Sequence, residues 1–168
     1  MKNSFLTYFF LALSAFLLFF LQVFALNPIP YFKFPVNFLT AFSICVCLFA
    51  NVSQRWFISI FCGLLMDVWF SSCSFYTLSL LIVNTIVVYL ALQTQVSYPF
   101  IIISSALGTA MVELINASLL GFCFFNENFN PFTILKDSLP YIASFNIFFN
   151  LILFRLLRTF FKVNSLWY

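Results

Sequence analysis

Residues 5–26 read FLTYFFLALSAFLLFFLQVFAL, an uninterrupted stretch of 22 residues without a charged side chain. An α-helix needs about 20 mostly apolar residues to cross the hydrocarbon core of a bilayer, which is about 30 Å thick. Asn27-Pro28-Ile29-Pro30 follows directly, and proline ends a helix because it lacks the backbone N–H and crowds the preceding turn. The stretch therefore predicts a membrane-spanning helix.

The alternative for this first segment is a cleaved signal peptide. Lys2 precedes the apolar run, and Val23-Phe24-Ala25 loosely fits a cleavage site. A signal peptide usually has an apolar core of about 7–15 residues, so an apolar run of 22 residues favours a retained span.

The rest of the chain continues the same composition. Of its 168 residues, 64% are hydrophobic and 7% are charged, whereas a soluble domain carries about 25% charged residues. We predict an all-α, polytopic membrane helix bundle of six transmembrane helices in one domain, residues 1–168, with five helices as the fallback because the second span is polar. The expected spans are residues 5–26, 36–54, 56–70, 75–92, 99–121 and 140–157.

The orientation follows from the distribution of Lys and Arg, which favour the cytoplasmic loops of membrane proteins. With the N-terminus inside, the outer side carries Lys33 and Lys136. The cytoplasmic side then carries Lys2, Arg55, Arg155, Arg158 and Lys162. We therefore expect a multi-pass membrane protein with both termini in the cytoplasm.

Composition also excludes several classes of function. The chain contains no histidine, which excludes a histidine general base or metal ligand. Its cations are scattered, whereas nucleic-acid binding needs them clustered on one face. The longest expected link between spans, residues 122–139, is too short to fold alone, so we expect no soluble catalytic domain.

Polar side chains recur on single faces of three expected spans, where they either join helices or line a polar cavity. The opposite face of the second span carries Phe38 and Phe42, so we expect that face to meet lipid. In the fifth span Ser104 and Gly108 have the spacing that allows two helices to approach closely. The polar stripes are Asn37, Thr40, Cys47, Asn51 and Gln54 in the second span, Ser105, Thr109, Glu113 and Asn116 in the fifth, and Asn146 and Asn150 in the sixth.

Two carboxylates fall inside expected spans, where an ionised acid costs about 2.5–3.5 kcal/mol. Asp67 is close to the end of the third span, and two interpretations are open. It is either linked to the serine-rich turn, with Ser71 as a hydrogen-bond donor, or it points inward as an anchor. Such an anchor would fix the bend between spans three and four or bind a partner. Glu113 lies deeper, and we expect it to be protonated or hydrogen-bonded by Thr109 or Asn116.

These acids do not form a catalytic pair of the intramembrane aspartyl type, because one of the two is a glutamate, and we expect no enzyme and no cofactor. Nor do the five cysteines predict a metal site, because Cys45 and Cys47 point to opposite faces of a helix. With Cys62 they are most simply small apolar core residues. Cys73 and Cys123 both fall at outer helix ends, and we offer a disulfide between them as a hypothesis.

The segment around Asp67 resembles a known family. Residues 61–80 read FCGLLMDVWFSSCSFYTLSL, and Gly63-Leu64-Leu65-x-Asp67 followed by Ser71 resembles the corresponding segment of the MreD family, the rod-shape-determining proteins. Length, number of spans and a basic C-terminal tail also resemble that family. The sequence departs from it in and after the turn, where the family usually has glycines and this chain has Ser72 and Phe75.

The resemblance implies a non-catalytic scaffold of the lateral wall-elongation complex (the elongasome), which controls peptidoglycan synthesis. Its partners would be an MreC-like single-span protein, a RodA-like glycosyltransferase, a penicillin-binding transpeptidase and, indirectly, MreB. It also implies a fold similar to the substrate-binding subunits of energy-coupling-factor importers. The match carries Gly63, Asp67 and Ser71 as structural or partner-binding residues. The polar pattern of the fifth span adds Gly108, Glu113 and Asn116 to them. The tail residues Arg155, Arg158 and Lys162 either contact anionic lipid or a cytoplasmic partner, or only anchor the chain by the positive-inside rule.

Two other functions remain open at the level of sequence. A vitamin-importer subunit would need a cavity lined by the polar stripes of spans two, five and six, whereas a scaffold would pack those stripes against one another. A lipid-handling or stress-related membrane protein of the same size is the third reading.

Overall fold

The computed structural model describes residues 4–26, 37–70, 74–94, 96–124 and 131–160. The described part of the chain is helical almost throughout, which confirms the predicted all-α bundle. The helices are α1 (Ser4–Phe20), continued by the π-helix η1 (Leu21–Leu26), then α2 (Phe38–Phe49), α3 (Val52–Phe70), α4 (Phe75–Gln93), α5 (Tyr98–Phe124) and α6 (Pro131–Phe160).

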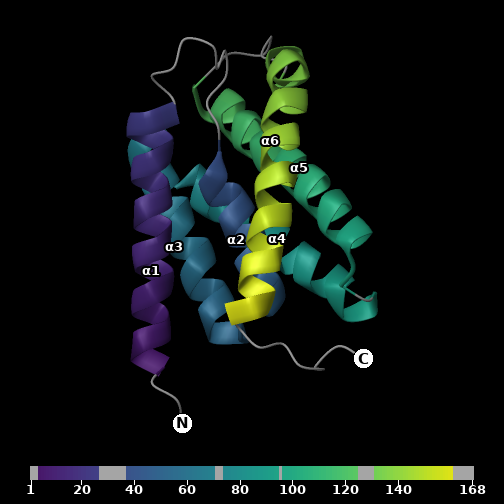
Figure 1. The fold of residues 1–168 in the computed structure, drawn as a ribbon. Helices are drawn as coiled ribbons and strands as arrows, with labels where there is room; N and C mark the ends of the chain where they lie inside the picture. Colours follow the sequence, from purple (N-terminus) through teal and green to yellow (C-terminus); the bar gives the residue numbers. More distant parts are fainter. Residues whose placement is uncertain (1–3, 27–36, 71–73, 95, 125–130, 161–168) are drawn as a thin grey trace.

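Helix α1 begins and α6 ends at the same end of the bundle (Figure 1). We call this the basal end and the opposite one the apical end. Successive helices run alternately away from the basal end and back toward it, as expected for a chain that crosses a membrane repeatedly (Figure 1). Four of them contain segments long and apolar enough to cross a bilayer: Phe5–Phe24, Phe75–Gln93, Tyr98–Cys123 and Ser138–Leu157.

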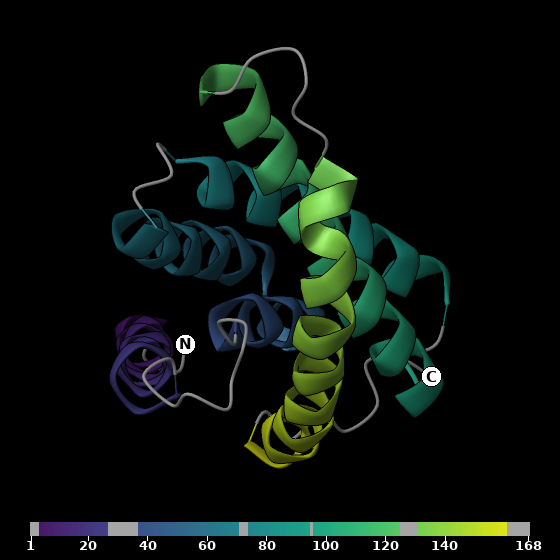
Figure 2. The same ribbon diagram turned by 90° about the horizontal axis from the view of Figure 1, so that it is seen from above.

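Helix α2 occupies the centre of the bundle and contacts each of the other five α-helices (Figure 2). All ten residues from Leu39 to Leu48 are buried, including Phe42 and Val46. The expectation that Phe38 and Phe42 mark a lipid-facing side is therefore wrong, since Phe42 is 3% exposed and Phe38 packs on Phe149 of α6. Helices on every side of α2 bury apolar and polar residues alike.

The predicted second span, residues 36–54, is too long. Helix α2 has 12 residues and a length of about 18 Å, which is less than the thickness of a hydrocarbon core. Ala50 ends it in an extended conformation, and α3 starts at Val52, so the third span begins before the predicted Trp56. Arg55 stabilises this tight connection, because its Nε donates to the Ala50 carbonyl oxygen at 2.7 Å.

The long link expected at residues 122–139 is also wrong. Helix α5 continues to Phe124, and α6 begins at Pro131 rather than at Pro140. Pro131 stands at the first helical position, where a missing N–H costs nothing, whereas Pro140 lies inside the helix. The predicted helix start at Pro140 is wrong because the prediction assumed that proline in a helix interior breaks the hydrogen-bond ladder, as it usually does.

Candidate functional site

Asp67 caps the first turn of α4. Its carboxylate accepts the backbone N–H of Tyr76 at 2.8 Å and that of Thr77 at 3.0 Å. The first N–H groups of a helix have no partner within the helix, and a carboxylate there also interacts favourably with the helix dipole. Ser74, at the usual capping position, has a φ of 69° and forms no side-chain cap hydrogen bond. These hydrogen bonds join the end of α3 to the first turn of α4, which is the arrangement that the anchor interpretation of Asp67 requires.

Gly63 lies one turn before Asp67 and allows α4 to approach α3. A Cβ atom built on Gly63 would lie 2.9 Å from the backbone nitrogen of Thr77 and 2.8 Å from its Oγ1. Real side chains do not tolerate such contacts without a backbone shift. Gly63 and Asp67 thus act together: the glycine brings the first turn of α4 close, and the carboxylate binds the N–H groups of that turn.

The first turn of α2 is capped inside the bundle by two amide side chains. Asn37 accepts the backbone N–H of Thr40 at 3.1 Å, and Gln22 of η1 accepts that of Leu39 at 3.4 Å. Gln22 is fully buried, and its Nε2 also donates to the sulfur of Met66. Since α2 starts inside the protein rather than at a water interface, its free N–H groups need such partners.

Glu113 joins the first turns of α2 and α4. Its Oε1 accepts from the Asn37 amide at 2.8 Å, and its Oε2 accepts from the Tyr76 hydroxyl at 3.1 Å. Asn116, one turn later on α5, is buried as well. We call Asn37, Asp67, Tyr76, Thr77 and Glu113 the carboxylate cluster; it connects four helices in the apical half of the bundle.

The donors predicted for Glu113, Thr109 and Asn116, are not the ones that bind it. Asn37 and Tyr76 donate to Glu113, whereas Thr109 accepts from the Asn146 amide of α6 at 3.0 Å. One turn away, Asn150 donates to Ser105 at 2.6 Å. The polar stripes of the fifth and sixth spans therefore bind each other, in agreement with the packing interpretation.

The polar stripe assigned to the second span does not lie on one helix. Asn37 caps α2, and Cys47 lies near its end, but Asn51 falls between two helices and Gln54 belongs to α3. Gln54 accepts the backbone N–H of Asn51 at 3.2 Å, so both take part in the connection. Ser43, beside the stripe, accepts from Asn84 of α4 at 2.7 Å.

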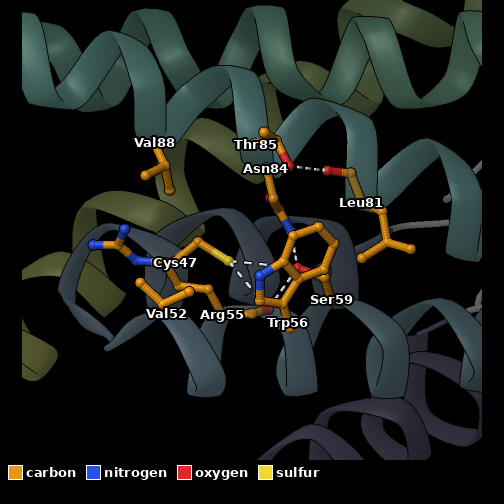
Figure 3. A pocket seen from close by; sticks show the side chains of 9 residues that line it. All are labelled: Cys47, Val52, Arg55, Trp56, Ser59, Leu81, Asn84, Thr85 and Val88. Carbon is orange, nitrogen blue, oxygen red and sulfur yellow. Dashed lines mark hydrogen bonds between the residues drawn. The ribbon is translucent and has the colours of Figure 1, made fainter.

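A pocket of about 220 Å³ lies between α3 and α4 (Figure 3). Its lining residues on these two helices are nearer the basal end than Asp67 and Tyr76 are. Asn84 lies behind it and donates to Ser59 at 2.7 Å, and the Ser59 hydroxyl donates to the Arg55 carbonyl oxygen at 2.8 Å. Cys47 of α2 approaches Ser59 at 3.6 Å. The pocket is lined by Cys47, Val52, Arg55, Trp56, Ser59, Leu81, Asn84, Thr85 and Val88.

The remaining predicted residues are distributed along the bundle. Gly108 is buried and makes room for Ile44 of α2, whose Cδ1 would lie 2.8 Å from a Cβ at that position. Cys123 is exposed near the end of α5, but Cys73 lies outside the described residues, so their pairing stays a prediction. Ser71 and Lys162 also lie outside, as does the Arg158 side chain, whereas Arg155 is exposed on α6.

Four residues of these clusters were missed by sequence reasoning: Gln22, Tyr76, Thr77 and Asn84. Gln22 had a usable signal, since it is a lone amide in an apolar run of 22 residues. Asn84 is likewise an isolated amide in the middle of an apolar helix. Tyr76 and Thr77 had none, because tyrosine and threonine are ordinary at the end of a membrane span.

The chemistry available to the carboxylate cluster is hydrogen bonding between helices. Asp67 and Glu113 both accept hydrogen bonds from neighbouring helices. No group of three or more His, Cys, Asp or Glu side chains that could hold a metal ion occurs in the described part of the chain.

Comparisons with protein-family models, with curated proteins and with solved structures found no match for this chain.

Proposed function

We propose that this protein is a non-catalytic membrane scaffold of the cell-shape complex, acting with an MreC-like single-span protein to control lateral peptidoglycan synthesis. Its wider partners are a RodA-like glycosyltransferase and a penicillin-binding transpeptidase, with MreB engaged indirectly. It resides in the inner membrane of a bacterium with both termini in the cytoplasm. The proposal starts from the resemblance of Gly63-Leu64-Leu65-x-Asp67 to the MreD family.

The observation that carries the proposal is the pairing of the polar stripes with one another. Asn146 and Asn150 bind Thr109 and Ser105, and Asn37 binds Glu113. A vitamin importer needs these side chains free to line a cavity. Their mutual hydrogen bonds, each worth about 0.6–2 kcal/mol in a membrane, favour a rigid body that holds neighbours.

The resembling motif has a structural role that suits a scaffold. Gly63 allows α4 to pack closely on α3, and the Asp67 carboxylate binds the first turn of α4. The carboxylate is thereby occupied within the protein and is not available to a substrate. A rigid hairpin presents its lipid-facing side chains at fixed positions, which is what a partner helix requires.

The surface available to a partner helix is apolar and rich in aromatic rings. Helix α1 packs on α2 and α3 and leaves much of its circumference uncovered. Large rigid rings provide contact area at low cost in side-chain entropy, which suits packing against a second helix. The exposed side chains of this helix include Phe5, Phe9, Phe10, Phe16, Leu17 and Phe20.

Affinity purification tests the proposal. The tagged chain, extracted from its own host in mild detergent, is expected to bring down a single-span coiled-coil protein and no bound vitamin. A matched control uses Leu92→Ala, which alters an exposed side chain near the end of α4, outside the motif. Recovery of a stoichiometric vitamin without any membrane partner would instead support the importer reading.

A further inference from the structure

The pocket between α3 and α4 plays no part in the proposed function. It opens sideways, since Trp56 and Thr85 at its edges are exposed to the surroundings of the bundle. Along α4 it extends from Val88 to Leu81, which is about 10 Å at 1.5 Å per residue. Its lining is mainly apolar, with Val52, Trp56 and Leu81 among the contributors (Figure 3).

The basal end of this pocket is positively charged. Arg55 lines it, and its guanidinium donates to the Ala50 carbonyl oxygen through Nε, which leaves the two terminal nitrogens for other acceptors. Asp67 is twelve residues further along α3, about 18 Å away, and its carboxylate binds the first turn of α4. Glu113 is bound in the same apical cluster. Neither Asp67 nor Glu113 therefore pairs with the Arg55 guanidinium at the mouth of the pocket.

Trp56 places the mouth of the pocket at the membrane surface. Tryptophan favours the level of the lipid headgroups, and Trp56 neighbours Arg55 in the first turns of α3, at the basal end of the bundle. An arginine at this level meets phosphate groups, and basic pockets between membrane helices bind anionic lipid headgroups. The apolar part of the pocket then extends from that level toward the middle of the bilayer.

The shape and lining of the pocket fit a lipid chain. It extends for about 10 Å along α4 and its lining is mainly apolar, whereas Arg55 at its basal end supplies one cation. An acyl chain that carries an anionic headgroup combines the same two features.

We propose that this pocket is a binding site for an anionic phospholipid of the basal leaflet, with an acyl chain between α3 and α4 and the phosphate on Arg55. The lipid chain covers Trp56 and Leu81, and the guanidinium supplies the preference for negative charge. The inference is independent of the scaffold function, since it depends only on the pocket and its charge.

Fluorescence quenching by brominated lipids tests the site in the full chain. The protein has three tryptophans, and Trp69→Phe with Trp167→Phe leaves Trp56 as the sole reporter. The variant is reconstituted into phosphatidylcholine vesicles that contain equal fractions of either dibrominated phosphatidylglycerol or dibrominated phosphatidylcholine. One cation at a membrane surface contributes about a fivefold preference, so the brominated anionic lipid is expected to bind about fivefold better.

Two controls make the result specific. Arg55→Gln is expected to abolish the preference, whereas Arg155→Gln on α6 is expected to keep it. A second reporter, Trp56→Phe with Trp167→Phe, leaves Trp69 at the apical end of α3 and is expected to show no preference. Equal quenching of Trp56 by both lipids would overturn the proposal. The absence of quenching by both lipids would also overturn it, because something other than lipid would then fill the pocket.

Discussion

The carboxylate of Asp67 lies 2.8 Å from the backbone nitrogen of Tyr76, nine residues later in the chain, and thereby binds the end of α3 to the start of α4. Tyr76 in turn donates its hydroxyl to Glu113 of α5. A helix N-terminus and a second carboxylate are thus connected through one tyrosine. The carboxylate cluster is the part of the bundle in which single substitutions have the clearest expected effects.

Replacing Asp67 with alanine removes three hydrogen bonds to the first turn of α4, two from backbone N–H groups and one from the Thr77 hydroxyl. Loss of a helix cap and of hydrogen bonds to a charged group is expected to lower the free energy of unfolding by about 2 kcal/mol. Membrane insertion should be unchanged, because the apolar spans remain. Unfolding in mixed detergent micelles measures the loss. Asp67→Asn, which keeps one carbonyl acceptor, should lose less, and equal stability of both variants and the wild type would show that the cap is unimportant.

Replacing Gly63 with alanine places a Cβ against the backbone of Thr77 and forces α3 and α4 apart. Overpacking of this kind typically costs about 1–3 kcal/mol. Thermal denaturation followed by circular dichroism measures the effect. The control is Leu64→Ala at the adjacent exposed position, which should stay within about 0.5 kcal/mol of the wild type. A Gly63 variant as stable as this control would contradict the close approach.

Tyr76 and Glu113 are expected to be energetically coupled. Tyr76→Phe and Glu113→Ala each break the same hydrogen bond, so their combined cost should be smaller than the sum of the single costs by about 1 kcal/mol. Tyr76→Phe with Asn150→Ala is the reference pair, since Asn150 bonds Ser105 and shares no partner with Tyr76. Additive costs in the first pair would argue against the bond.

Replacing Gly108 with leucine fills the space that Ile44 of α2 occupies against α5. The variant is expected to lose about 1–3 kcal/mol of stability. Ile44→Ala in the same chain should restore part of the loss, because it returns volume at the same contact. If Ile44→Ala does not restore any stability, the leucine at position 108 contacts a residue other than Ile44.

The sequence was sufficient to predict the helical membrane bundle and the interhelical role of the polar residues. Charge-free runs such as residues 5–26 have few alternatives, and an amide or carboxylate inside a span needs a partner on another helix. The bend at Asp67 was also within reach, because an acid close to the end of one span and the start of the next has few other uses.

The centre of the bundle was less predictable. An alternation of phenylalanine and polar side chains indicates a lipid face and a protein face, but helices surround α2 completely, so both faces are buried. The pairing of Asn84 with Ser43 and of Glu113 with Asn37 depends on which helices become neighbours. Nothing in the local sequence of either partner specifies that arrangement.

Depletion of the protein in its own host tests the central claim most directly. The measurement is the ratio of cell length to width as the protein level falls, with a plasmid copy of the wild type as the control. The scaffold account predicts that rod-shaped or polarised cells become round, that the wild-type copy restores their shape, and that a copy with Asp67→Ala does so less well. Cells that keep their shape after complete depletion would contradict it.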